Sequence, residues 1–166
     1  MTTATPPHTA EVKLAARPLG QLFWLPSAYF VLHTLEELPT FAAWVTRHFG
    51  PSTSESFVFS HIPLILLVMG ASLQATRRGR HGAWVVLAVA AQWQFGLNAL
   101  FHLTTTALFG EYAPGLLTAS VLALPLTPYV LRRVWREERL TPRAFVGALA
   151  LGTLLAVLAV GVLLLH

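Results

Sequence analysis

The 166-residue sequence contains no cysteine and no aspartate, and these two absences exclude several kinds of site. Without cysteine the chain cannot form disulfides, attach haem through cysteine or bind a metal through thiolates. Charged residues are also scarce, at 11% of the chain against about 25% in a typical soluble domain. Hydrophobic residues make up 55%, and the mean hydropathy is +0.62. This composition predicts an integral membrane protein with one domain.

The net charge of +4 does not predict a nucleic-acid partner, because the cations are not gathered on one surface. Most arginines lie in short segments between apolar runs, around residues 77–80 and 132–139. Residues 1–18 contain three prolines and are expected to form a flexible cytoplasmic tail. They lack the short apolar core and small-residue cleavage site of a signal peptide. We expect a protein of the inner (plasma) membrane. Its expected substrate is a membrane lipid or another apolar small molecule, and a homodimer is one possible oligomeric state.

Five apolar runs are long enough to cross a membrane, since about 20 helical residues span the hydrocarbon core. Strands of a barrel would be shorter and would alternate in polarity, so helices are expected throughout. The predicted fold class is an all-α integral membrane protein, with one five-helix transmembrane domain over residues 19–166. The expected runs are 20–46, 56–76, 83–109, 112–131 and 144–165.

The basic residues also predict how these helices are oriented. With the N-terminus in the cytoplasm, ten of the eleven lysines and arginines fall on the cytoplasmic side, and only Arg47 falls outside. This bias predicts a cytoplasmic N-terminus and a C-terminus outside the cell. Trp44 and Tyr112 are expected in the outer aromatic belt. In the last run, Ala148 and Gly152 belong to a stripe of small residues four apart, which predicts close helix packing.

A functional site is predicted around residues 31–39, where His33, Glu36 and Glu37 lie within an apolar run. A charged side chain at the centre of a membrane helix costs about 2.5–3.5 kcal/mol, so two unpartnered glutamates would cost roughly 5–7 kcal/mol. Both glutamates lie three or four residues from His33 and therefore on the same side of a helix. The default interpretation is a buried site that contains a metal, a proton or a polar partner.

Polar residues of two other runs are expected at a similar depth. With a rise of about 1.5 Å per residue, His33 lies near the midplane, and His61, Asn98 and His102 lie roughly 3–9 Å toward the outside. Asn98 and His102 are four residues apart, in a polar stripe that must face the bundle interior or a wet cavity. We therefore expect these side chains to converge in the outer half of the membrane.

Imidazoles combined with carboxylates are typical ligands of divalent transition metals, and we favour zinc over iron. The predicted ligands are His33, His61 and His102, with Glu36 or Glu37 as a further ligand or as general base. Such a metal makes a bound water acidic enough to attack as hydroxide at neutral pH. We expect Asn98 to hold a ligand histidine by its second ring nitrogen, or to polarise a substrate oxygen. No other cofactor is predicted.

The residues leave other interpretations open. Asn98 and His61 are also explained by hydrogen bonds between packed helices, and His33 with the two glutamates by a structural network that shares a proton. Histidine and glutamate form proton relays in transporters, although many carriers show an internal repeat that is not found here. A second metal bridged by a glutamate would suit a di-iron oxidoreductase. His48 and His81 are expected to be ordinary surface residues.

Three segments carry a resemblance to a known family. His33-Thr34-Leu35-Glu36-Glu37 has a His-x-x-Glu-Glu pattern, and it is followed by Asn98-Ala99-Leu100-Phe101-His102 and by Tyr112-Ala113-Pro114-Gly115 with Thr118. Over roughly residues 20–130 the chain resembles the HXXEE family of small bacterial membrane proteins. That family's function is uncharacterised, so the resemblance implies an architecture and a polar site without an activity or catalytic residues. From its residues, we expect an intramembrane metal-dependent hydrolase, with a transporter and a di-iron oxidoreductase as alternatives.

Overall fold

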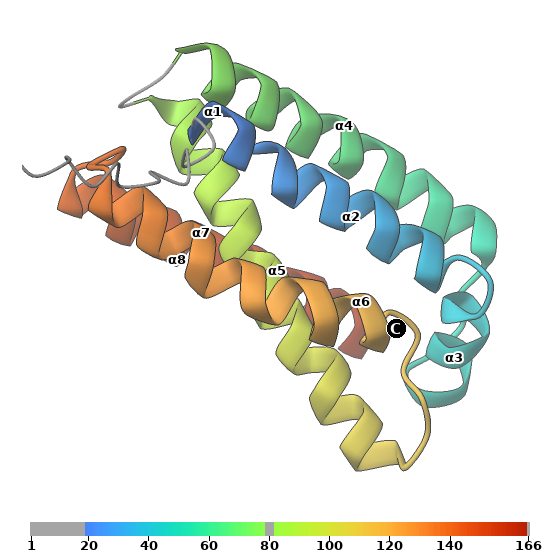
Figure 1. Cartoon of the computed structure of the whole chain (residues 1–166). Helices are drawn as coiled ribbons and strands as arrows, with labels where there is room; N and C mark the ends of the chain where they lie inside the picture. Colours follow the sequence, from blue (N-terminus) through green and yellow to red (C-terminus); the bar gives the residue numbers. More distant parts are fainter. Residues whose placement is uncertain (1–18, 79–81, 166) are drawn as a thin grey trace, which may run out of the picture.

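The computed structural model describes residues 19–78 and 82–165, and every regular element in these ranges is helical. The predicted all-α class is therefore confirmed for this part of the chain. The predicted tail, residues 1–18, and His81 lie outside the described residues. The elements are α1 (Leu19–Leu22), α2 (Trp24–Glu37), α3 (Phe41–His48), α4 (Ser54–Arg78), α5 (Ala83–Phe109), α6 (Leu116–Thr118), η1 (Ala119–Ala123), α7 (Leu124–Arg136) and α8 (Pro142–Leu164) (Figure 1).

Three of these helices, α4, α5 and α8, are long and apolar enough to cross a membrane. They correspond to the predicted runs 56–76, 83–109 and 144–165, and their ends differ from the prediction by at most two residues. Length and composition of these helices identify the chain as a membrane protein. The other two predicted spans, 20–46 and 112–131, are not helical over their whole length.

The first apolar run does not form one continuous helix over residues 20–46. α2 ends at Glu37, a turn follows, and α3 begins at Phe41. Pro39 has no backbone N–H and cannot continue a helix, and the turn is closed by a hydrogen bond from Thr40 N to Glu37 O of 3.1 Å. The break places Glu37 on the last turn of α2.

Residues 110–115, part of which was predicted to be helical, form a loop. Gly110 ends α5 in a left-handed conformation with a φ of 66°, as many helices end. After the loop, α6, η1 and α7 follow one another without a gap. η1 is a π-helical segment, and Pro125 follows it closely. Proline has no N–H, so the α-helical hydrogen bond from residue 125 to the carbonyl of Val121 cannot form. The loss of this bond favours the wider π-helical turn. The fourth apolar run therefore becomes helical only at Leu116.

The central helix is α5, which contacts α8, α4, η1 and α7. Its contact with α8 is close, because a Cβ atom added to Gly152 would collide with the carbonyl oxygen of Ala90. Ala148, one turn earlier on α8, is fully buried. The predicted packing role of this small-residue stripe is thus confirmed for both residues.

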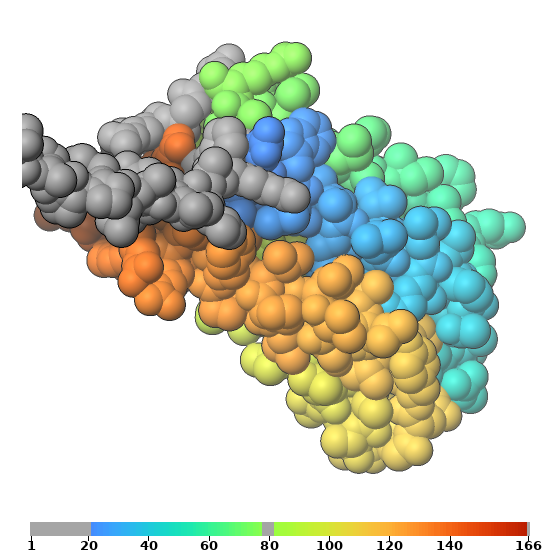
Figure 2. Space-filling view, viewed as in Figure 1, coloured from blue at the N-terminus to red at the C-terminus, as the bar shows by residue number. Residues whose placement is uncertain are grey.

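The bundle has two distinct ends, with α1 at one and α3 at the other (Figure 1). At the α3 end, Trp44 packs against Phe41, Phe49 and Phe109. Its side chain is 1% exposed, so the prediction that Trp44 belongs to an outer aromatic belt is wrong. Figure 2 shows the segment that follows α5 lying against α2 and α3 on the face it presents.

Candidate metal centre

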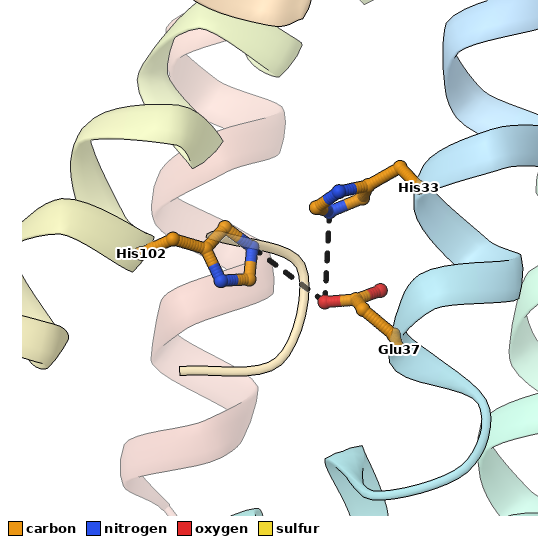
Figure 3. Close-up of side chains that lie close together, drawn as sticks. All are labelled: His33, Glu37 and His102. Carbon is orange, nitrogen blue, oxygen red and sulfur yellow. Dashed lines mark ion pairs between the residues drawn. The ribbon is translucent and has the colours of Figure 1, made fainter. Parts of the chain in front are cut away.

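Two histidines and one glutamate meet between α2 and α5. His33 and Glu37 project from α2, where their spacing of four residues puts them on one side of the helix, and His102 projects from α5 (Figure 3). The Oε1 atom of Glu37 lies 3.5 Å from Nε2 of His33 and 3.5 Å from Nε2 of His102. All three side chains are buried, and their ligand atoms lie within 4.8 Å of one another.

These distances suit a divalent transition metal. A metal about 2.1 Å from each ligand atom separates neighbouring ligand atoms by about 3.0–3.4 Å, for angles between octahedral and tetrahedral. The two separations of 3.5 Å between Glu37 Oε1 and the imidazole nitrogens are close to this range. The three side chains could therefore hold a metal with little movement.

Asn98 contacts both imidazoles, but through atoms that the sequence did not predict. Its Nδ2 atom lies 3.0 Å from Nε2 of His33 and 3.0 Å from Nε2 of His102. Nε2 is the nitrogen that faces Glu37, so the expectation that Asn98 holds the second ring nitrogen is wrong. For His33 that second nitrogen, Nδ1, instead lies 2.8 Å from Oγ1 of Thr118. Thr118 therefore orients the His33 ring.

His61 lies at the edge of the cluster. Its Nε2 atom is 3.8 Å from the other carboxylate oxygen of Glu37, Oε2, while its Nδ1 atom donates to the carbonyl of Phe57 at 2.8 Å. The His61 side chain is 20% exposed, whereas those of His33, Glu37 and His102 are at most 5% exposed. The structure thus places His61 between the buried cluster and the outer surface of α4.

Glu36 does not join the cluster, although it is the neighbour of Glu37. Adjacent residues of a helix point about 100° apart, so the two carboxylates reach different partners. The carboxylate of Glu36 accepts hydrogen bonds from the hydroxyl of Tyr112 and from the backbone N–H groups of Leu117 (2.9 Å) and Thr118 (2.8 Å). A carboxylate at the first N–H groups of a helix is stabilising. Glu36 therefore fastens the start of α6 to the end of α2.

Gly115 covers the cluster from the loop between α5 and α6. Its φ of +92° disfavours any residue with a side chain. A Cβ atom there would lie 2.5 Å from Cε1 of His33, 2.8 Å from Cε1 of His102 and 3.1 Å from Cγ of Glu37. The glycine backbone thus closes directly over the three side chains. In the sequence, Gly115 and Thr118 are among the residues that carry the family resemblance.

A second polar network holds the same loop at the α3 end. Arg47 donates to Oε1 of Glu111 at 2.9 Å, and His48 lies 2.8 Å from the same oxygen. The His48 ring also stacks on Phe109, with centroids 3.9 Å apart, so its expected role as an ordinary surface residue is wrong. The hydrogen bond from Arg47, followed by that from His48, lowers the pKa of the Glu111 carboxyl below its ordinary value. Glu111 lies beyond the end of α5.

The family of proteins of unknown function with an HXXEE motif matches residues 24–130. The chain belongs to the HXXEE family. The motif that names the family spans His33 to Glu37, and the matched range also contains Asn98, His102 and Gly115.

One relative of this HXXEE protein is an uncharacterised protein, YrkK, of Bacillus subtilis strain 168. It is 30% identical over 122 residues, which cover 64% of this chain and 74% of the relative. No solved structure matches the chain. The family assignment therefore confirms the resemblance but supplies no activity.

Proposed function

We propose that this HXXEE protein is an intramembrane metal-dependent hydrolase. The observation that carries the proposal is the convergence of His33, Glu37 and His102 on one buried point. Two histidines and one glutamate form a ligand set of catalytic zinc sites, which keep a further position for water or substrate. Zinc is therefore the metal we favour.

The residues around this point have separate roles in the proposal. A divalent metal bound by His33, Glu37 and His102 would make a water molecule acidic enough to attack a carbonyl or phosphoryl centre. His61, whose Nε2 atom faces Glu37, would accept a proton from the reaction. Glu36 is a positioning residue, because its three hydrogen-bond donors belong to the segment that closes the site.

We propose five membrane crossings, with the N-terminus in the cytoplasm and the C-terminus outside. α1 and α2 together extend from Leu19 to Glu37, and α6 to α7 from Leu116 to Arg136, so each stretch has close to the length needed for a crossing. The arginine-rich segment 132–139 includes the C-terminal end of α7, whereas Arg47 lies on α3 and pairs with Glu111. α3 lies at the other end of the bundle (Figure 1). This charge asymmetry supports the inner membrane and the proposed orientation.

The surface of α4 supports a lipid or another apolar small molecule as substrate. Phe59, Ile62 and Leu64 are large, exposed apolar residues on this helix, as expected where a helix faces lipid. His61 lies among them in the sequence and is the partly exposed neighbour of Glu37. An amphipathic molecule approaching from the bilayer would therefore meet His61 first.

Metal analysis and lipid hydrolysis test the proposal together. Protein purified without chelator is expected to contain about one equivalent of zinc, and His33→Ala, His102→Ala and Glu37→Gln should each lose it. His48→Ala is the matched control, because His48 lies outside the cluster and should leave the zinc content unchanged. Less than a tenth of an equivalent of any transition metal in the unaltered protein, or equal loading of all four variants, would reject the metal centre.

Activity is then measured in vesicles that contain ester-linked phospholipids, with mass spectrometry of the products. The unaltered protein should release hydrolysis products, and Glu37→Gln should not. Zinc or proton flux that depends on Glu37, without any lipid product, would replace the hydrolase with a transporter. Two equivalents of iron per chain would instead point to a di-iron oxidoreductase.

A further inference from the structure

The side-chain amide of Asn98 lies beside the three proposed ligands, at a place where a fourth ligand of the same metal would lie. Its terminal amide atom lies 3.0 Å from each Nε2 atom, and Glu37 Oε1 lies 3.5 Å from each of them. Atoms bound to one metal at about 2.1 Å are separated by about 3.0 Å at right angles and about 3.4 Å at tetrahedral angles. The distances from the two Nε2 atoms to Asn98 and to Glu37 are therefore close to those between atoms that share one metal.

In the structure, the atom of Asn98 at this place is the nitrogen. An amide N–H cannot bind a metal, but it donates to the lone pair of a neutral imidazole nitrogen. The Nδ1 atom of His33 lies within hydrogen-bond distance of Thr118, which leaves the Nε2 lone pair free to face Asn98. The amide of Asn98 thus covers the two lone pairs that a metal would use.

A bound cation changes which end of the Asn98 amide is favoured toward the site: the N–H end is favoured without a metal, and the oxygen end is favoured with one. The N–H groups carry partial positive charge and are repelled by a metal, whereas the carbonyl oxygen is a good ligand for a hard divalent cation. The two ends of an asparagine amide have nearly the same size, so a half-turn about the Cβ–Cγ bond exchanges Nδ2 for Oδ1 at the same place. No movement of α5 is needed.

We infer that Asn98 turns its amide when the metal binds and becomes the fourth protein ligand through Oδ1. This inference rests on the proposed metal centre and adds a ligand to it. The resulting set of two imidazoles, one carboxylate and one amide oxygen still leaves a position for water, because zinc expands to five ligands and manganese or iron to six. The site is therefore suited to the harder divalent transition metals as well as to zinc.

The chain offers an unusually clean test, because Asn98 is its sole asparagine. Protein labelled with ¹³C at the side-chain carbonyl of asparagine has one labelled amide, whose infrared stretching band is isolated by subtracting the unlabelled spectrum. Adding one equivalent of Zn²⁺ should move this band to lower frequency, because coordination withdraws electrons from the C=O bond. A band that stays in place or moves to higher frequency on zinc binding would overturn the inference.

Zn²⁺ affinity of two variants gives an independent measurement. Asn98→Ala should bind Zn²⁺ at least tenfold more weakly than the unaltered protein, and Asn98→Asp, which keeps an oxygen at this place, should bind at least as tightly as the unaltered protein. If Asn98→Asp binds Zn²⁺ no more tightly than Asn98→Ala, an oxygen at this position does not bind the metal, and the inference fails.

His33→Ala separates this inference from the metal centre itself. If His33→Ala loses Zn²⁺ but Asn98→Ala keeps full affinity, the metal centre stands and Asn98 is not a ligand. If His33→Ala binds Zn²⁺ like the unaltered protein, the metal centre fails. Should Asn98→Ala not yield folded protein, the infrared measurement on the unaltered chain still decides.

Discussion

Substitution of Gly115 by alanine should damage the candidate centre, because this glycine is the backbone that covers it. The added Cβ atom would lie 2.5 Å from Cε1 of His33 and 2.8 Å from Cε1 of His102, where an ordinary contact is about 3.5–4.0 Å. The His33 ring cannot simply move away, since Thr118 and Asn98 hold its two nitrogens. The backbone conformation, with a φ of +92°, adds strain for any residue with a side chain.

The expected loss in the free energy of unfolding is the sum of these two effects. A left-handed backbone costs a non-glycine residue about 1–2 kcal/mol, and an atom inserted into a packed interior costs about 1–3 kcal/mol. Gly115→Ala should therefore lose about 2–5 kcal/mol. Gly110→Ala is the matched control, because Gly110 also has a positive φ, of +66°, but nothing lies within 4 Å of its added Cβ atom.

Unfolding of both variants is measured in the same detergent, and Zn²⁺ affinity is measured on the folded protein. Gly115→Ala should be less stable than Gly110→Ala by about 1–3 kcal/mol, which is the steric contribution alone. It should also bind Zn²⁺ at least tenfold more weakly, whereas Gly110→Ala should stay within about twofold of the unaltered protein. Equal stability and equal Zn²⁺ affinity of the two variants would show that Gly115 does not cover the histidines.

Three further predictions concern other parts of the structure. Gly152→Ala should destabilise the contact of α8 with α5 by about 1–3 kcal/mol in detergent unfolding, whereas Gly147→Ala, with free space around its Cβ atom, should not. Glu36→Gln should lower the unfolding midpoint through weaker hydrogen bonds to α6 but change Zn²⁺ affinity less than threefold; loss of zinc would make Glu36 a ligand after all. The basic partners of Glu111 on α3 lower the pKa of its carboxyl in the folded protein. The Glu111 carboxylate therefore stabilises the fold at pH values above its ordinary pKa of 4.5. This stabilisation is lost as the pH falls through the lowered pKa of the folded state. The unfolding midpoints of the unaltered protein and of Glu111→Gln should therefore differ at pH 6 and converge as the pH falls below 4.5 and through the lowered folded pKa, and a constant difference would contradict this reasoning.

Local properties of the sequence were sufficient to predict the class of protein and the residues of interest. Apolar runs of about 20 residues predicted α4, α5 and α8 closely, because the length needed to cross a membrane depends on each helix alone. The free-energy cost of a charge in such a run singled out His33 and Glu37 before any contact was known. The helical period placed Asn98 and His102 on one face of α5 for the same local reason.

Only the tertiary structure decided which carboxylate belongs to the cluster and which ring nitrogen Asn98 contacts. Glu36 and Glu37 are neighbours in sequence, and their different roles depend on Thr118, which is about eighty residues away and donates to Glu36. Likewise, the loop with Gly115 reaches His33 only because α5 carries the chain across the bundle and Gly110 turns it back. Periodicity and hydropathy describe one helix at a time, whereas the direction in which a side chain points in a site depends on the packing of segments far apart in the chain.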